Sequence, residues 1–90
     1  MPENVPENRR VEDRIHSEGE VTLSFDDPAP RRLAGRLLDY STRGFRAAHG
    51  WARLENGQVV EFRHNTASGR ARVMWNRIVG DAVETGFLVL

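Results

Sequence analysis

Short segments in which apolar and polar residues alternate make up most of this sequence from Glu20 to the C-terminus. In the first segment, Val21, Leu23 and Phe25 alternate with polar residues. Alternation with a period of two is typical of a strand that buries one face. Turn-forming residues interrupt the pattern about every ten residues. The predicted strands cover residues 20–25, 32–40, 44–48, 59–63, 70–75 and 84–90.

No segment shows the apolar period of an amphipathic helix, so the strands dominate the prediction. Six short strands separated by turns indicate an antiparallel all-β domain. In a chain of 90 residues, closure of the sheet into a small barrel buries one face and protects the strand edges. We therefore predict a six-stranded antiparallel β-barrel, with a loop at 65–69 and with Ala71, Val73 and Trp75 on the same face of the fifth strand.

The composition is that of one globular domain with a single modest core. The chain is 39% hydrophobic and contains no cysteine, which excludes disulfides and cysteine-based zinc sites. His16, His49 and His64 stand singly and lack the spacing of metal ligands, so we expect no metal site. No apolar block suits a secretory signal or a membrane span, and we expect a cytoplasmic protein.

Charge is unevenly distributed along the chain. Residues 1–30 hold eight acidic residues and three arginines, whereas residues 31–90 hold ten arginines and five acidic residues. All thirteen basic residues are arginine, which fits a nucleotide ligand and fits codon bias equally well. The balanced total disfavours a long nucleic acid. The proline-containing, polar start predicts a flexible arm at 1–16, followed by the barrel at 17–90.

The segment from Asp39 to Gly44 combines a predicted turn with polar chemistry. Asp39 and Ser41 both accept hydrogen bonds, and Gly44 suits a positive φ or a close approach to the backbone. Asp, Ser and Gly are also common residues of ordinary turns. The segment alone therefore fits a binding site or a simple strand connection.

A second motif upstream favours the binding site. Arg10 and Arg14 form Arg-x-x-x-Arg, and Asp39, Ser41 and Gly44 form Asp-x-Ser-x-x-Gly. In this order the two motifs resemble the PilZ domain family. Further similar segments are Val73-Met74-Trp75, like the family's Val-x-Trp strand, and Gly86 to Val89, like its closing strand. The resemblance covers residues 9–90 and implies the same six-stranded barrel.

The sequence departs from the family at its end. PilZ domains often carry a helix after the last strand, whereas this sequence stops at Leu90, so we expect little or no C-terminal helix. Leu88 and Leu90 are then expected at an exposed edge, which would suit a dimer contact or a C-terminal helix that this sequence does not include. The expectation is a monomer or a weak homodimer.

The PilZ resemblance implies binding of the second messenger cyclic di-GMP. By position, Arg10 and Arg14, assisted by Arg9, would hold phosphate and guanine edges. Asp39 would accept from guanine N1 and N2 hydrogens, Ser41 would bind phosphate or base, and Gly44 would let the turn approach the ligand. Trp75 would pack against a base, or else fill the barrel core.

A ligand that orders the N-terminal arm would make the domain a switch toward a protein partner. We expect no enzymatic activity, because Ser41 lacks the Gly-x-Ser-x-Gly setting of hydrolases. The alternative is a small barrel that binds single-stranded RNA or a protein without cyclic di-GMP. A single-stranded RNA site would need exposed aromatic residues on the strands, and Trp51 is the one obvious candidate.

Overall fold

The computed structural model describes residues 15–16, 19–26 and 29–90, the first two by their backbone only. It contains seven strands and no helix in these residues. The strands are β1 (Ile15–His16), β2 (Glu20–Phe25), β3 (Arg31–Tyr40), β4 (Gly44–His49), β5 (Val59–His64), β6 (Ala67–Val79) and β7 (Ala82–Val89). Arg9, Arg10 and Arg14 lie outside the described residues.

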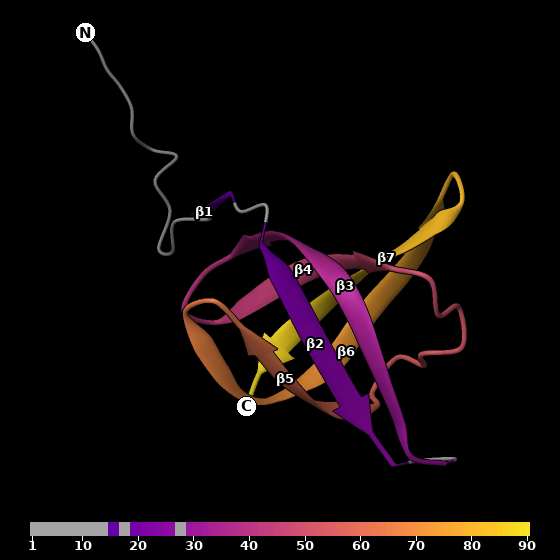
Figure 1. Cartoon of the computed structure of the whole chain (residues 1–90), viewed down its shortest axis with the longest axis horizontal. Helices are drawn as coiled ribbons and strands as arrows, with labels where there is room; N and C mark the ends of the chain where they lie inside the picture. The colour runs from indigo at the N-terminus through magenta and orange to yellow at the C-terminus, as the bar shows by residue number, and fades with distance from the viewer. Residues whose placement is uncertain (1–14, 17–18, 27–28) are drawn as a thin grey trace, which may run out of the picture.

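Six strands form a closed antiparallel barrel, as the sequence predicted (Figure 1). Their order is β3-β2-β5-β6-β7-β4, and pairing of β3 with β4 closes the ring. β1 pairs with β3, opposite Asp39 and Tyr40. Because β4 also pairs with β3 at these two residues, β1 must lie on the other edge of β3, beyond the end of β2.

One aromatic cluster forms the centre of the barrel. The ring of Phe45 lies 4.7 Å from that of Phe62 and 4.6 Å from that of Phe87, measured between centroids. Around them pack Leu23 and Leu37, both fully buried. Aromatic rings at these separations stabilise a core beyond the effect of the area they bury. Val60, Phe62 and Phe87 are all buried in this core.

The boundaries of β6 differ most from prediction. The expected loop at 65–69 is a two-residue turn, Asn65-Thr66, and β6 begins at Ala67. β6 then continues to Val79, so that β6 and β7 project as a hairpin beyond the barrel wall (Figure 1). Leu90 is 53% exposed, as expected, whereas Leu88 is half-buried, so the expectation is wrong for that residue. Ile78 in the projecting hairpin is 74% exposed.

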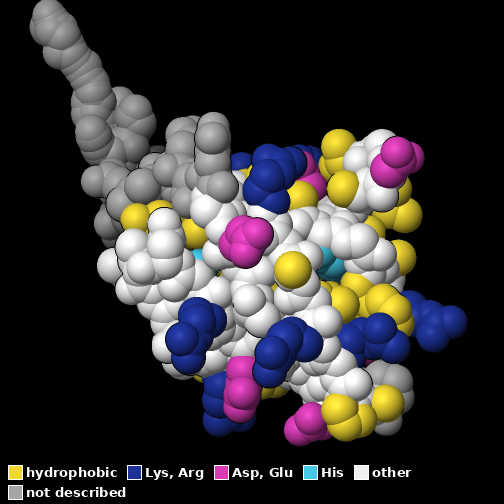
Figure 2. All heavy atoms as spheres, viewed as in Figure 1, with side chains coloured by type: hydrophobic (Ala, Val, Ile, Leu, Met, Phe, Trp, Pro, Cys, Tyr) yellow, Lys and Arg dark blue, Asp and Glu magenta, His cyan; other side chains and the backbone are white. Residues whose placement is uncertain are grey.

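No helix in the described residues is long and apolar enough to cross a membrane. On the face shown in Figure 2, arginine side chains stand in separate groups divided by polar surface. This spacing differs from the continuous basic stripe that long nucleic acids require.

Candidate functional site

A row of four paired residues crosses the outer surface of β3, β4, β7 and β6. Asp39 is the partner of Arg46, Arg46 is the partner of Gly86, and Gly86 is the partner of Trp75. Residues directly opposite in a sheet share one face. The sheet therefore brings Asp39 and Trp75, 36 positions apart in sequence, onto one band of surface with only Arg46 and Gly86 between them.

Two β-bulges aim the ends of this row outward. The register shifts between Leu37 and Asp39 on β3, and between Val73 and Trp75 on β6. Leu37 and Val73 point into the core, and without the extra residue Asp39 and Trp75 would do the same. The prediction that Trp75 shares a face with Val73 is therefore wrong. Trp75 is 36% exposed, which excludes the core as its location.

Asp39 is held by Arg46. The carboxylate oxygen Oδ2 accepts from Nε of Arg46 at 2.8 Å and from Nη2 at 2.5 Å. The hydrogen bond that Arg46 donates to Asp39 raises the pKa of Arg46 above its ordinary value, and burial opposes this only in part. Asp39 is 4% exposed. A nearly buried carboxylate needs such a partner, because an uncompensated charge there is strongly destabilising.

Ser41 shapes the turn between β3 and β4. Its backbone N–H donates to the carbonyl of Gly44 at 2.8 Å, and its Oγ accepts from the backbone N–H of Arg43 at 3.2 Å. Gly44 begins β4 opposite Leu88. A Cβ on Gly44 would overlap the carbonyl oxygen of Phe87, so the glycine allows β4 and β7 to approach. It is not among the glycines with positive φ.

Beside the row lies a shallow surface groove of about 560 Å³, which we call the Trp75 groove. It contains two arginines and no acidic residue among its lining. The lining residues are Arg43, Gly44, Phe45, Arg46, Met74, Trp75, Gly86, Phe87 and Leu88. The indole of Trp75 lies against Gly86, where a Cβ would overlap it. The groove is thus an electropositive surface with an aromatic ring on its wall.

Four of the predicted site residues therefore lie around one groove. Gly44 and Trp75 line it, Asp39 is bonded to Arg46 in its wall, and Ser41 is bonded to Arg43. The sequence analysis did not identify Arg46. A signal was available, because four residues separate Tyr40 from its strand partner Phe45, which places Asp39 opposite Arg46 in the hairpin.

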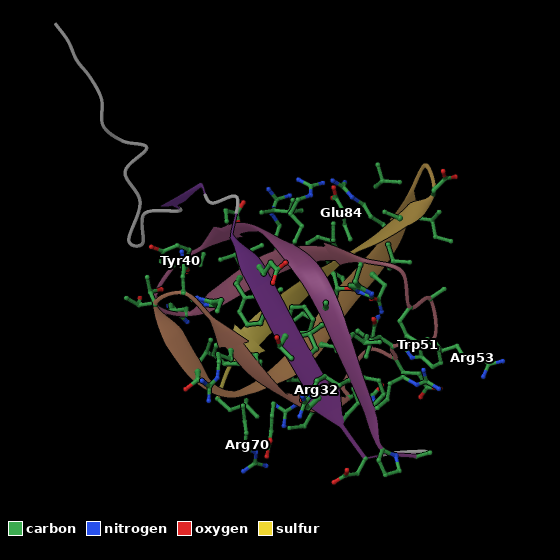
Figure 3. All side chains as sticks on the ribbon, in the orientation of Figure 1. Arg32, Tyr40, Trp51, Arg53, Arg70 and Glu84 are labelled. Carbon is green, nitrogen blue, oxygen red and sulfur yellow. The ribbon has the colours of Figure 1, made fainter. Side chains whose placement is uncertain are left out.

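β1 adds a fifth strand to the row of paired residues, at the end that carries Asp39. His16 is the backbone partner of Asp39, and Ile15 is the partner of Tyr40. The Arg10/Arg14 motif ends one residue before Ile15. Figure 3 shows Tyr40 at the end of the barrel where β1 lies.

A buried polar chain lies behind the groove, one residue along from Trp75 and Gly86. The backbone N–H of Trp51 donates to Nδ1 of His49 at 3.0 Å, which leaves Nε2 to donate to Oγ1 of Thr85 at 2.7 Å. The hydroxyl of Thr85 donates to Asn76 at 2.6 Å, and the Asn76 amide donates to the carbonyl of Leu54. In this arrangement Nδ1 of His49 accepts a hydrogen bond and Nε2 donates one, so the imidazole must be neutral.

We expect the domain to lose stability as the pH falls below about 6.5, the ordinary pKa of histidine. Burial lowers the pKa of His49, and of His64, in the folded chain. The unfolded chain therefore binds more protons, so the free energy of unfolding rises with pH by at most about 1.4 kcal/mol per unit for each histidine. Urea unfolding between pH 5 and 8 measures this slope. His49→Gln should reduce it, and an unchanged slope in both His49→Gln and His64→Gln would contradict the assignment.

A second groove of about 590 Å³ lies over β2, β5 and the start of β6. It is lined by Arg32, Arg63 and Arg70 among polar residues and contains none of the predicted site residues. Figure 3 shows Arg32 and Arg70 on the side of the barrel away from Glu84. Among the residues described, its wall includes one carboxylate, Glu61. We therefore take the Trp75 groove, which is similar in size, as the candidate site.

Within the described part of the chain, no three His, Asp or Glu side chains gather closely enough to hold a metal ion.

Comparison with solved structures gives the fold family. The PilZ domain of YcgR from Escherichia coli, determined with c-di-GMP, matches with a TM-score of 0.69 and 20% sequence identity, over 92% of this chain and 79% of that one. The crystal structure of E. coli YcgR in complex with c-di-GMP matches with a TM-score of 0.68 and 21% identity, over 91% of this chain and 38% of that one. No protein-family profile and no curated protein sequence matches the chain. The chain thus has the fold of a PilZ domain, as the motifs predicted.

Proposed function

We propose that this domain is a receptor for cyclic di-GMP that changes conformation on binding and makes or breaks no covalent bond. The observation that carries the proposal is the pairing of β1 with β3 beside Asp39. The Arg motif directly precedes β1, and the Asp-Ser-Gly motif begins at Asp39, within the part of β3 that pairs with β1. We infer that this pairing brings the Arg motif toward the end of the barrel that carries Asp39. The YcgR domain with the same fold was determined with this ligand.

The chemistry of the groove fits a cyclic dinucleotide. A guanine offers N1 and N2 hydrogens to a carboxylate, and we assign that contact to Asp39. Trp75 presents its ring on the same band of surface, so a base could stack on it. Ser41 and Gly44 would border the ligand at the turn. Arg10 and Arg14, with Arg9, would supply the guanidinium groups that bind phosphate and guanine edges.

The switch would use the N-terminal arm, which we place at residues 1–16 with the barrel at 17–90. An arm that becomes ordered over the ligand loses conformational entropy, and the ligand must provide that free energy. In exchange, one surface would be covered and another presented to a protein effector in the cytoplasm. We propose a monomer or a weak homodimer, with the exposed Leu90 as part of a possible contact.

A single-stranded RNA site is the competing function. RNA-binding barrels stack successive bases on several exposed aromatic rings. Here Trp75 is the one exposed aromatic residue in the described part of the chain. Trp51 is half-buried under the guanidinium of Arg31, which lies 3.9 Å from the centroid of its ring. One exposed ring does not suit a strand of several nucleotides, so cyclic di-GMP is the better candidate.

Titration with cyclic di-GMP tests the function directly. We expect a dissociation constant on the order of micromolar, about −8 kcal/mol, and shifts in the amide NMR signals of Asp39 to Arg46, Trp75 and Gly86. A uridine or adenosine oligonucleotide should bind more weakly and with steeper salt dependence, because more phosphates take part. Unmoved signals at saturating cyclic di-GMP would reject the function. Tight, strongly salt-dependent oligonucleotide binding would favour the RNA alternative.

A further inference from the structure

Arg46 uses only part of its hydrogen-bonding capacity. A guanidinium carries five N–H donors, and two of these, one on Nε and one on Nη2, bond to Oδ2 of Asp39. Among the residues that the structure describes, no other side chain or carbonyl accepts from Arg46 within hydrogen-bonding distance. Three donors remain, and the group that carries them lines the Trp75 groove.

Asp39 fixes where those donors point. The Asp39 side chain is 6% exposed and that of Arg46 is 33% exposed, so the carboxylate is enclosed and the guanidinium faces outward. Two bonds to a rigid strand hold the long Arg side chain in one geometry before any ligand arrives. A preorganised donor gives up less conformational entropy when it binds than a free one does.

The groove offers an anion a favourable electrostatic setting. The Asp39–Arg46 pair is neutral as a unit, but Arg43 adds a second guanidinium and the lining contains no Asp or Glu. Gly86 separates Arg46 from Trp75 and has no side chain, so nothing from β7 covers the guanidinium at that point. A base on Trp75 would therefore leave its phosphate close to Arg46.

We propose that Arg46 is a phosphate-binding residue supplied by the barrel wall, with Asp39 as its positioning residue. The inference rests on the proposed function and deepens it, since the phosphate is one of the two in cyclic di-GMP. The ligand would then be held by arginines from two sources, the N-terminal arm and β4.

Calorimetry on two Arg46 variants and one matched control tests this role. We expect Arg46→Gln to weaken cyclic di-GMP binding about ten- to a hundredfold, the range for losing a charge-assisted contact. Arg46→Lys keeps the charge beside Asp39 and so protects the fold, but it loses the planar fork, and we expect about tenfold weaker binding. Arg63→Gln removes the same charge from the other groove and should bind as the wild type does. Thermal unfolding confirms that each variant is folded.

The ³¹P NMR signal of the bound ligand separates a phosphate contact from a merely structural role. In Arg46→Lys the bound ligand's phosphorus resonance should shift relative to that in the wild-type complex, because its hydrogen-bond donor has changed. An unchanged resonance, or wild-type affinity in both Arg46 variants, would overturn the inference while leaving the function intact. Absence of cyclic di-GMP binding by the wild type would reject the proposed function, and the inference with it.

Discussion

Gly44→Ala is expected to destabilise the domain by about 3 kcal/mol, near the upper end for overpacking a close contact. A Cβ at this position would overlap the carbonyl oxygen of Phe87. That oxygen belongs to the backbone of β7, which is paired with β4 along its length, so relief requires the two strands to move apart. Movement there would also disturb the stacked rings of Phe45 and Phe87. Chemical denaturation of the wild type and the variant measures the difference.

Gly50→Ala is the matched control. A Cβ on Gly50 would meet nothing within 4 Å, and the residue is not among those with positive φ. The same substitution there should be neutral or slightly stabilising, because alanine restricts the unfolded chain more than glycine does. Equal destabilisation by both variants would show that steric overlap at Phe87 is not the cause.

This result bears on how the Asp-Ser-Gly motif is interpreted. Gly44 is required by the closure of β4 on β7, whatever binds nearby. Loss of ligand affinity in Gly44→Ala would therefore carry no information about a ligand contact unless the fold survives. Asp39 and Arg46 differ, because the contact between them is made by their side chains and not by closely packed backbone.

The alternating pattern predicted the barrel because most of its strands bury one face. Val21, Leu23 and Phe25 alternate and point inward, and β2 ends where the pattern does. β6 was misjudged for a physical reason. Ala67 to Gly69 has the polar and small residues of a loop, but pairing with β5 keeps it extended, so tertiary contacts override the local preference.

The candidate site was harder to predict, because bulges determine it. Strict alternation would place Asp39 on the same face of the sheet as Leu37, and Trp75 on the same face as Val73. In each strand one inserted residue moves the later side chain to the opposite face. A single sequence carries no signal for such an insertion. Arg46 was overlooked for a related reason, since its importance arises from a partner across the hairpin and not from its neighbours in sequence.

Replacing Arg10 or Arg14 with alanine should weaken cyclic di-GMP binding about ten- to a hundredfold each. Truncating one charge-assisted Arg contact typically costs about 1.5 to 3 kcal/mol. The expectation comes from the motif and from the attachment of the adjoining β1 beside Asp39. Both residues precede the described strands in the sequence, so we expect the unfolding temperature to change little. Calorimetry and thermal unfolding of the same samples separate the two effects.

The double variant, with both arginines replaced, tests whether the N-terminal arm contacts cyclic di-GMP at all. If the two contacts are independent, their losses add, and binding falls about a hundredfold or more. Arg63→Ala removes equal charge from the opposite groove and should leave affinity unchanged, since long-range attraction is screened within about 10 Å at ordinary salt. Wild-type affinity in the double variant would confine recognition to the barrel wall. Arg43 and Arg46 are the two arginines that line the Trp75 groove there.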